Sequence, residues 1–284
     1  MNDIEREFLN SMVYWWPRVV RLPVPKPTTV LITIEDIVDD VFVCTLSEGE
    51  DRNACKRARE KLDALSGLLD EYVRKYIGGY PVFLRSDYTS CKHYPEDVLG
   101  KPIYRIDSPD EFRPHITQLI VECHEFIPVR GVFGMPRPNA VAVREWIRVE
   151  KWTDKIPRFY GNLEVRVFVK GGAVERIYPY YHISGLKKYV LSKMSNVDYE
   201  EILREYRSRY VQTIIDGVDE ITRLAETIAR ADGIREHDWS IDFVLAEVKG
   251  RKAWVFIDMA LAEASWRPEE ETDEDKLIME AAKR

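Results

Sequence analysis

Charged side chains interrupt several apolar segments of this chain, and their types suit the binding of an anion together with a metal ion. The segments VFLR, AVAVREW, LEVRVFV, WSIDFVL and VFIDMAL contain, in that order, Arg85, Arg144, Arg166, Asp242 and Asp258. Any one of them fits a half-buried strand with one wet face, because side chains alternate between the two faces of a strand. The set indicates more than that. Arginines make bidentate contacts with phosphate or carboxylate, and aspartates supply the oxygen ligands that hard cations prefer.

The two aspartates stand at matching distances from a tight turn. Asp242 lies eight residues before Gly250 and Asp258 eight residues after it, in strands joined by Lys249-Gly250-Arg251. Symmetric antiparallel pairing of these strands would place the two carboxylates opposite each other. Such carboxylates repel each other unless a cation lies between them, and Mg²⁺ is a natural occupant that usually arrives with phosphates. The sequence therefore predicts a site for a nucleoside triphosphate and Mg²⁺.

Other chemistries find less support in the sequence. The chain contains no GxxxxGK[ST] loop, no GxGxxG fingerprint after a strand and no GxSxG elbow, and no histidine has an evident triad context. Cys91, His93, Cys123 and His124 remain an alternative as a zinc site or a thiol–imidazole pair, although their spacing matches no zinc pattern. Without a CxxC pair, the cysteines are expected to be isolated, reduced thiols.

The elements that must position these residues follow from periodicity. Apolar spacing predicts helices over 4–16, 51–76, 109–125 and 198–231. Ser108 is the expected N-cap of the third helix, with Glu111 as its capping-box partner. β-Branched and alternating segments predict strands over 29–34, 41–46, 81–86, 140–150, 162–172, 173–181, 238–248 and 252–261. Hairpins join most of these strands, so the pattern favours an α+β fold over a doubly wound parallel sheet.

Composition limits the function classes. Hydrophobic residues make up 45% of the 284 positions and charged residues 32%, which is typical of a globular protein, and no apolar run is long enough to span a membrane. The formal net charge of −7 disfavours a nucleic-acid-coating protein, because duplex affinity comes largely from phosphate neutralisation. MNDIEREFLN lacks the basic start and apolar stretch of a signal peptide, so a cytoplasmic location is expected. The acidic segment EEETDEDK is expected to be a solvated tail.

In order and spacing, the site residues resemble those of ATP-grasp domains. The similarity is greatest to the clade recognised by two arginines and one lysine and to the cell division cycle protein 123 family, and it extends over nearly the whole chain. The stretches that carry it are YWWPRVVRLPVPKPTTVLI, YIGGYPVFLRSDYTSCKHYP, VREWIRVE, LEVRVFVKGGAVERIYPYYHIS and WSIDFVLAEVKGRKAWVFIDMALAE. The resemblance implies an α+β ATP-grasp fold, in which two lobes with antiparallel sheets enclose a nucleotide cleft. It divides the chain into an N-terminal lobe (1–80), a middle lobe with a phosphate-contacting loop (81–139), a C-terminal lobe with adenine hinge and metal hairpin (140–267) and an acidic tail (268–284).

The resemblance also implies roles for individual residues. Arg85 and Lys92 would contact the triphosphate of ATP, and Glu145, Trp146 and Ile147 would form the adenine hinge. Arg144 and Arg166 would contact phosphates or a substrate carboxylate. Asp242 and Asp258 would bind Mg²⁺. Lys92 would lie on a loop that closes over ATP, and with Arg166 it would carry the catalytic charge. One position departs from the family pattern. Ala260 stands where the family has a metal-ligating asparagine, and Glu263 would replace that ligand if the chain turns there.

The activity that the resemblance implies is ATP-dependent ligation, in which a carboxylate attacks the γ-phosphate and an amine or similar nucleophile captures the acyl phosphate. Positioning and charge neutralisation carry such catalysis, in agreement with the absence of a triad motif. The alternative is an ATP-binding assembly chaperone with little turnover, similar to the assembly factor of translation initiation factor 2.

Two features of the sequence favour the chaperone. Ala260 removes a metal ligand, and the cluster Tyr14-Trp15-Trp16 is either a partner-binding patch or, as is more common, the packing face of a terminal helix. A nucleic-acid ligase and a structural domain whose strands have one wet face also remain open. The expected partners are a nucleotide and an unknown acceptor or protein, without a membrane and without a general role for nucleic acid.

Overall fold

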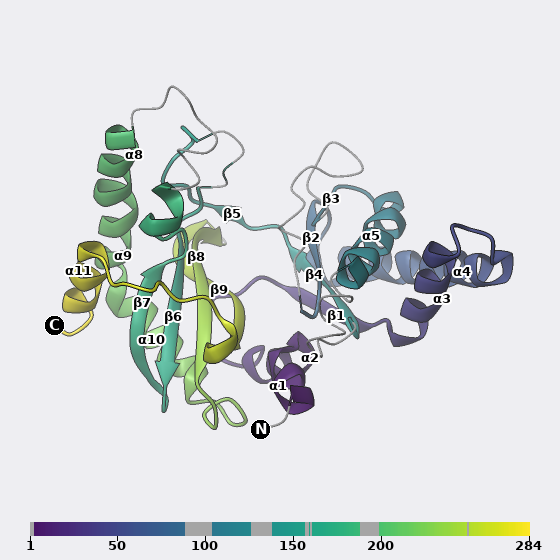
Figure 1. Cartoon of the computed structure of the whole chain (residues 1–284), viewed down its shortest axis with the longest axis horizontal. Coiled ribbons are helices and arrows are strands. Elements are labelled where there is room, and N and C mark those ends of the chain that lie inside the picture. Colours follow the sequence, from purple (N-terminus) through teal and green to yellow (C-terminus); the bar gives the residue numbers. More distant parts are fainter. Residues whose placement is uncertain are drawn as a thin grey trace. The chain divides into compact units, whose positions relative to one another are not determined.

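The chain folds into a mixture of helices and strands with two antiparallel sheets, so the expected α+β class is confirmed (Figure 1). The computed structural model describes residues 3–88, 104–125, 138–156, 159, 161–187, 199–248 and 250–284. Within these ranges no helix is both long and apolar enough to cross a membrane.

The chain divides into two compact units. Unit 1 comprises Met1–Trp16 and Pro27–Trp146, and unit 2 comprises Pro17–Lys26 and Ile147–Arg284. The lobe boundaries expected after residues 80, 139 and 267 all fall inside these units.

Up to residue 145, a sheet of strand order β1-β4-β2-β3 accompanies a set of helices. The elements are α1 (Asp3–Asn10), α2 (Met12–Val19), β1 (Thr29–Thr33), α3 (Glu35–Leu46), α4 (Arg52–Tyr72), the π-helical turn η1 (Val73–Ile77), β2 (Val82–Ser86), β3 (Arg105–Ile106), the 3₁₀ turn η2 (Pro109–Glu111), α5 (Phe112–Glu125) and β4 (Ala140–Glu145). The predicted helix at 4–16 is thus two helices that break at Ser11, and Pro17 lies inside the second.

One face of this sheet forms the core of unit 1. Val82 and Leu84 of β2 and Val141 and Val143 of β4 pack with buried residues of α3, α4 and α5. Because side chains alternate along a strand, the neighbouring positions of β2 and β4 point to the opposite face. That opposite face carries Arg85, so the core helices and the candidate arginines lie on different sides of the sheet.

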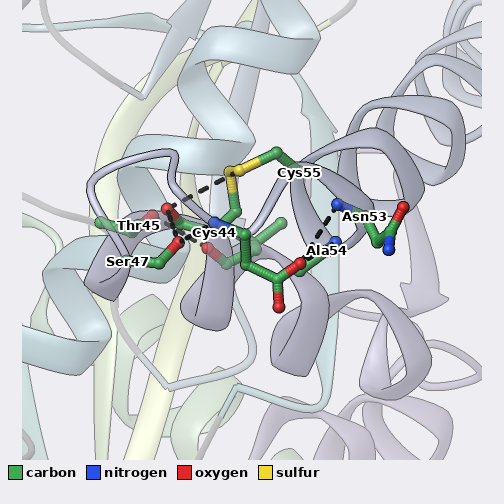
Figure 2. Close-up of a disulfide and its surroundings, with 8 residues drawn as sticks. Cys44, Thr45, Ser47, Asn53, Ala54 and Cys55 are labelled. Atoms are coloured by element: carbon green, nitrogen blue, oxygen red, sulfur yellow. Dashed lines mark hydrogen bonds between the residues drawn. A yellow bond between two sulfur atoms is a disulfide. The ribbon is translucent and has the colours of Figure 1, made fainter.

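The segment predicted as a strand at 41–46 is helical, and that prediction is wrong. VFVCTL is rich in β-branched residues, but Ile37, Val38 and Val41 are buried together at helical spacing in α3. The expectation of isolated thiols is wrong as well. Figure 2 shows the disulfide between Cys44, near the end of α3, and Cys55, in the first turn of α4. It closes a loop of sequence separation 11 between two helices that pack on each other.

The start of the long helix α4 follows the expected rules, whereas the predicted cap of α5 does not. Asp51 accepts hydrogen bonds from the N–H groups of Asn53 and Ala54 at 3.1 and 2.9 Å. The side chain of Ser108 makes no capping bond, and Glu111 instead accepts the N–H of Asp107 at 2.7 Å. The capping box predicted at this position is therefore wrong.

After residue 146, a second antiparallel sheet has the order β5-β8-β6-β7, with β9 paired to β8. The elements are β5 (Arg148–Val149), β6 (Glu164–Lys170), β7 (Ala173–Pro179), α8 (Tyr199–Glu205), the π-helical turn η3 (Tyr206–Val211), α9 (Gln212–Asp216), α10 (Val218–Ala229), β8 (Trp239–Val248), β9 (Arg251–Leu261), the 3₁₀ turn η4 (Ala262–Ala264) and α11 (Asp273–Ala281). The strand predicted over 140–150 is therefore two strands, β4 and β5, in different sheets.

Helix α10 contacts β6, β7 and β8 on one face of this second sheet. Its buried positions Ile221, Leu224 and Ile228 recur at helical spacing, as the sequence predicted for the segment 198–231. That segment is broken only by the π-helical turn η3 and by Gly217. The sheet face opposite α10 is the one that carries the candidate charges of unit 2.

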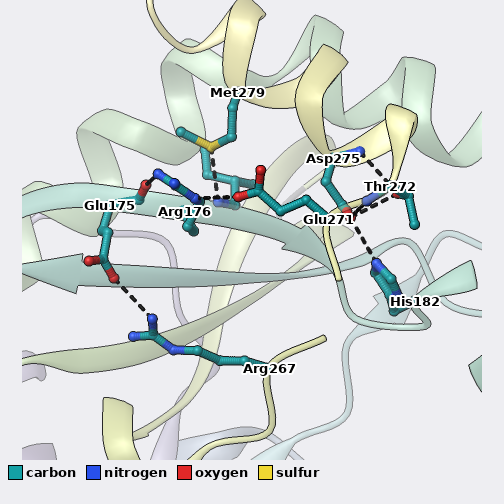
Figure 3. Close-up of polar contacts among 9 residues, drawn as sticks. Glu175, Arg176, His182, Arg267, Glu271, Thr272, Asp275 and Met279 are labelled. Carbon is teal, nitrogen blue, oxygen red and sulfur yellow. Dashed lines mark hydrogen bonds and ion pairs between the residues drawn. The ribbon is translucent and has the colours of Figure 1, made fainter. Parts of the chain in front are cut away.

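The acidic C-terminal segment forms a docked helix, so the expectation of a solvated tail is wrong. Thr272 and Asp275 form a capping box at the start of α11, and the side chains of Glu274 and Asp275 are buried. Figure 3 shows α11 lying against β7, where the N–H of Ile177 donates to Met279 Sδ at 3.2 Å. The helix thereby covers the outer edge of β7, an edge that would otherwise present unpaired backbone groups.

Candidate functional site

A partly buried, bidentate ion pair in unit 2 joins two neighbouring strands. Arg166 of β6 stands directly opposite Asp242 of β8. Its Nε donates to Oδ1 and its Nη2 to Oδ2 of the aspartate, both at 2.8 Å, which is the bidentate geometry of the strongest ion pairs. The side chains are 19% and 9% exposed. Burial by itself would lower the pKa of Arg166, but the charge of Asp242 and its hydrogen bonds outweigh burial and hold that pKa above its ordinary value.

Asp258 of β9 stands opposite Asp242, as the sequence predicted, although the route to that pairing differs. Near the turn, Val248 pairs with Arg251, a register in which Asp242 would face Ile257. The register shifts by one residue between Asp242 and Phe243, so Ile257 is the extra residue of a β-bulge. The bulge turns Asp258 to the same sheet face as Asp242, because one residue of shift exchanges the two faces of a strand.

The structure thus brings three predicted residues of unit 2 together on one sheet face. The sequence predicted a cation beside the two carboxylates, and the guanidinium of Arg166 is such a cation. Arg166 neutralises Asp242, and Asp258 Oδ1 accepts its neighbour's N–H from Met259 at 3.0 Å. A carboxylate has about four lone-pair positions, and Arg166 uses two of those on Asp242. The remaining lone pairs of Asp242, with the carboxylate of Asp258 on the same face, fit Mg²⁺, which is usually bound through one or two carboxylates with water and phosphate oxygens.

The third expected ligand does not join them. The chain does turn after β9, in η4, which contains Glu263. Among the described residues, however, no three His, Cys, Asp or Glu side chains gather closely enough to hold a metal ion. Ala260, opposite Ser240, has no donor atom in its side chain. From the described part of the chain, a metal at this place would therefore have two carboxylates as ligands.

Two aromatic residues complete this face, and the sequence analysis missed both. Tyr178 of β7 stands opposite Arg166, and the ring of Tyr180 lies 4.8 Å from the Arg166 guanidinium carbon. An aromatic face attracts a guanidinium and holds its plane in place. The alternation in VERIYPYY, which follows the arginine strand through a hairpin, was the available signal.

No family model matches the chain, and no curated protein matches it significantly. The assignment of roles therefore depends on the geometry of the two units.

In unit 1, the two arginines lie diagonally across a strand pair. Arg85 of β2 stands opposite Ala142, and Arg144 of β4 stands opposite Phe83 two positions away. Long side chains at such diagonal positions on one face are within reach of a shared ligand. The Nη2 of Arg144 donates to Met12 Sδ at 3.3 Å.

The N-terminal helices lie on the arginine side of this sheet. The ring of Trp16 lies 5.7 Å from the guanidinium carbon of Arg144. Trp15 and Trp16 are both buried, so the N-terminal aromatic cluster packs its helix, as is more common for such clusters.

The predicted hinge residues mark the passage from one unit to the other. Glu145 ends β4, and its Oε2 accepts hydrogen bonds from the N–H and the hydroxyl of Thr28 at 3.2 and 3.0 Å. Trp146 is 37% exposed and stacks with Arg105, whose guanidinium carbon lies 5.1 Å from the ring. Ile147 packs with the hydrophobic cluster around Val244 in unit 2. An exposed indole at this position is suited to stacking on a base.

Part of the predicted site falls on residues that the structure does not describe. Lys92, Cys91 and His93 lie outside the described ranges, as do the side chains of Cys123 and His124. The phosphate contact of Lys92 and the zinc alternative stay predictions.

Asp87, which the sequence analysis did not single out, anchors the N-terminal helices to the arginine sheet. It follows β2 and accepts hydrogen bonds from the Ser11 hydroxyl at 2.7 Å and from the N–H groups of Asn139 and Ala140 at 3.0 and 3.3 Å. Burial raises the pKa of this carboxyl, and the three donors offset only part of that effect. FLRSD continues the period-2 charge pattern beyond Arg85, which was the signal in the sequence.

Asp87→Asn is expected to leave the stability of unit 1 within about 1 kcal/mol of the wild type, whereas Asp87→Ala lowers it by about 2–3 kcal/mol. Asparagine keeps an acceptor for the backbone donors, while alanine leaves all three buried donors without one. The raised folded-state pKa means that the wild-type carboxyl loses stability as the pH rises from the unfolded-state pKa through the folded-state pKa. The stability of Asp87→Asn relative to the wild type should therefore increase with pH in denaturant titrations. A difference independent of pH would contradict this account.

Proposed function

We propose that this chain binds Mg·ATP in the manner of an ATP-grasp protein. One observation carries the proposal: the β-bulge that sets Asp258 opposite Asp242, beside the bidentate contact with Arg166, on the sheet face away from α10. A bulge that turns a charged residue to the face of two other charged residues is typical of a functional site. A purely structural hairpin gains nothing from two facing carboxylates.

In this proposal, Asp242 and Asp258 hold Mg²⁺, whose charge neutralises the phosphates of ATP. Arg166 orients Asp242 and adds positive charge on the same face. Within unit 1, Arg85 and Arg144 lie on one sheet face and suit an anion there, and the exposed ring of Trp146 suits a purine. Lys92 follows β2 in the sequence, and its proposed role is to contact the phosphates of ATP from a loop that closes over them.

The reaction that best suits such a site is ATP-dependent ligation through an acyl phosphate. An assembly chaperone that binds ATP with little turnover is the second candidate, and the metal side of the site favours it. Ala260 offers no ligand, and Glu263 does not gather with the two aspartates. A metal ion held by two carboxylates can bind the nucleotide. Such a site offers few positive groups to neutralise the additional negative charge that develops during phosphoryl transfer.

Nucleotide binding is tested by thermal unfolding with millimolar Mg·ATP. Saturation at about one hundred times the dissociation constant adds about 2.7 kcal/mol, which raises the Tm of a chain of this size by about 5 °C. Asp258→Asn is expected to abolish most of this shift, whereas Glu247→Gln, at the exposed far end of the same hairpin, leaves it unchanged. No shift in the wild type, or an equal shift in both variants, would overturn the proposal.

The two candidate activities separate in a second experiment. A ligase releases ADP and phosphate when a carboxylate and an amine acceptor are supplied. An assembly factor binds ATP without release and is recovered from its native extract in a fixed ratio to a protein partner. Brisk ATP hydrolysis by the isolated chain would exclude the assembly factor.

A further inference from the structure

An exposed serine in unit 2 faces a buried histidine. His182 follows β7, and Ser184 lies two residues later in a helical segment that starts at residue 183. The Ser184 hydroxyl oxygen lies 2.7 Å from His182 Nδ1. The serine is exposed, whereas the histidine side chain is 1% exposed. A base therefore lies behind a hydroxyl that solutes can reach.

The backbone assigns the tautomer of His182. The N–H of Ser184 points at Nδ1 at 3.4 Å, and a backbone N–H can only donate. Nδ1 therefore carries the lone pair, and the ring proton lies on Nε2. In this tautomer Nδ1 accepts the hydroxyl proton of Ser184, which is the arrangement that a general base requires.

A buried carboxylate lies on the other side of the ring. His182 Nε2 donates to Asp275 Oδ2 at 2.9 Å, and both side chains are 1% exposed. The same oxygen accepts the N–H and the hydroxyl of Thr272, each at 2.8 Å, so the capping box of α11 fixes the carboxylate (Figure 3). Ion pairs of Arg176 with Glu271 and of Arg207 with Glu274 hold α11 against the rest of the unit.

The hydrogen bonds run in the order Ser184–His182–Asp275, which is the order of a hydrolase triad with the two ring nitrogens exchanged: here Nδ1 faces the serine and Nε2 the carboxylate. Capping of a short helix and anchoring of α11 explain His182 and Asp275 structurally. They do not require an exposed hydroxyl at the outer end of the chain of hydrogen bonds. The indole of Trp266, 53% exposed, lies 5.7 Å from the His182 ring and offers an apolar surface beside that base.

We propose that Ser184 is a nucleophile toward small carboxylic esters, with His182 as its general base. Ser184 Oγ attacks the ester carbonyl, and its proton passes to His182 Nδ1. The bond to the leaving alkoxide or phenoxide breaks, and the leaving group takes that proton. The product is an ester of Ser184, which water cleaves by the same proton transfers. Asp275 orients His182 and stabilises the imidazolium that forms.

The groups around His182 agree with this assignment. β7 contributes Tyr178, whose ring centroid lies 6.2 Å from that of His182, and α11 contributes Asp275. Tyr206 of η3 lies beside Ile183, the next residue of the chain. Burial raises the pKa of Tyr206 well above its ordinary value and also raises that of Tyr178, so both phenols are neutral near neutral pH. The charged group that contacts the His182 ring is thus the carboxylate of Asp275.

The test uses the full chain with p-nitrophenyl acetate and no nucleotide, so its result is independent of ATP binding. Acetylated serines are located by peptide mass spectrometry. Ser208, exposed in η3, is the internal reference. The expected result is acetylation of Ser184 about 100-fold faster than of Ser208, because general-base assistance contributes at least that factor. Ser184→Ala should lose the rapid release of p-nitrophenol, and Ser208→Ala should keep it.

The pH profile distinguishes a base from a helix cap. The rate at Ser184 should rise as an imidazole loses its proton and then level off. His182→Gln should reduce it to the rate of Ser208, and if that variant fails to fold, the wild-type profile decides. Equal rates at the two serines, or a rate that keeps increasing in proportion to hydroxide, would show that His182 only caps its helix and would overturn the proposal.

Discussion

Asp242→Ala is expected to lower the free energy of unfolding by about 3–5 kcal/mol, because it leaves the Arg166 guanidinium partly buried without its counter-charge. The wild-type pair has two hydrogen bonds of 2.8 Å and side chains that are 19% and 9% exposed. Neither Tyr178 nor Tyr180, which lie beside Arg166, can replace the lost negative charge. Urea titration followed by circular dichroism measures the change, provided that the m-value stays constant.

The matched control is an exposed pair of an arginine and a carboxylate in the same unit, joined by one hydrogen bond. Arg176 and Glu271 are 2.7 Å apart with side chains 41% and 42% exposed. Glu271→Ala is expected to cost less than about 1 kcal/mol, since exposed pairs gain little. Asp242→Leu combined with Arg166→Met should recover most of the stability that Asp242→Ala loses, because both partners of the ion pair are then replaced. Equal costs for Asp242→Ala and Glu271→Ala would contradict this interpretation.

The stability of this pair also bears on the proposed metal. A buried ion pair contributes less to stability than its distances suggest, because both ions lose their hydration. Apolar residues would fill the same positions at no cost in stability. The placement of Arg166, Asp242 and Asp258 on one sheet face is therefore compatible with the proposed Mg·ATP site and is not required by folding alone.

The sequence predicted the facing aspartates, but it could not predict the bulge that produces the pairing. Counting from Gly250 assumes a symmetric hairpin, whereas Val248 pairs with Arg251 and Ile257 is inserted. The asymmetric turn shifts the register by one residue, and the inserted Ile257 shifts it back, so Asp242 still pairs with Asp258. Nothing in VFIDMAL marks Ile257 as the bulged residue, because the bulge is a property of the pairing between two strands.

Local patterns failed where neighbouring segments decide the structure. VFVCTL has the composition of a strand, yet Ile37 and Val38 before it extend the buried stripe to helical spacing. The disulfide of Cys44 was not predicted for the same reason. The helix that ends at residue 46 brings that thiol to Cys55 at the start of the next helix. Tertiary packing overrides β propensity here.

Contacts between distant segments were beyond reach for another reason. Asp275 lies 93 residues after His182, and its segment has the acidic composition of a solvated tail. The capping box of Thr272 was nevertheless visible in the sequence T-x-x-D, and it predicts a helix start at that place. Helix α11 docks on the edge of β7, and the composition of its segment does not reveal this docking site.

Gly217→Ala is expected to lower the free energy of unfolding by about 3 kcal/mol, the second large effect. Gly217 separates α9 from α10, and a Cβ added there would lie 2.2 Å from Trp254 Nε1 and 3.1 Å from its Cε2. Trp254 of β9 is 2% exposed, so its ring has no space to move into. The backbone of Gly217 has φ −101°, which alanine adopts without strain, so the cost is steric alone.

Two comparisons isolate that steric term. Gly67→Ala, inside α4, meets nothing within 4 Å and should stabilise the chain by up to about 1 kcal/mol through helix propensity. Trp254→Phe removes the Nε1 atom that the new methyl group would strike, so Gly217→Ala should cost less in that background than in the wild type. If the losses in free energy of unfolding from Gly217→Ala and Trp254→Phe were additive, the added methyl group would not clash with the Trp254 ring. The expected coupling instead places the junction of α9 and α10 firmly on β9, the strand that carries Asp258 on its opposite face.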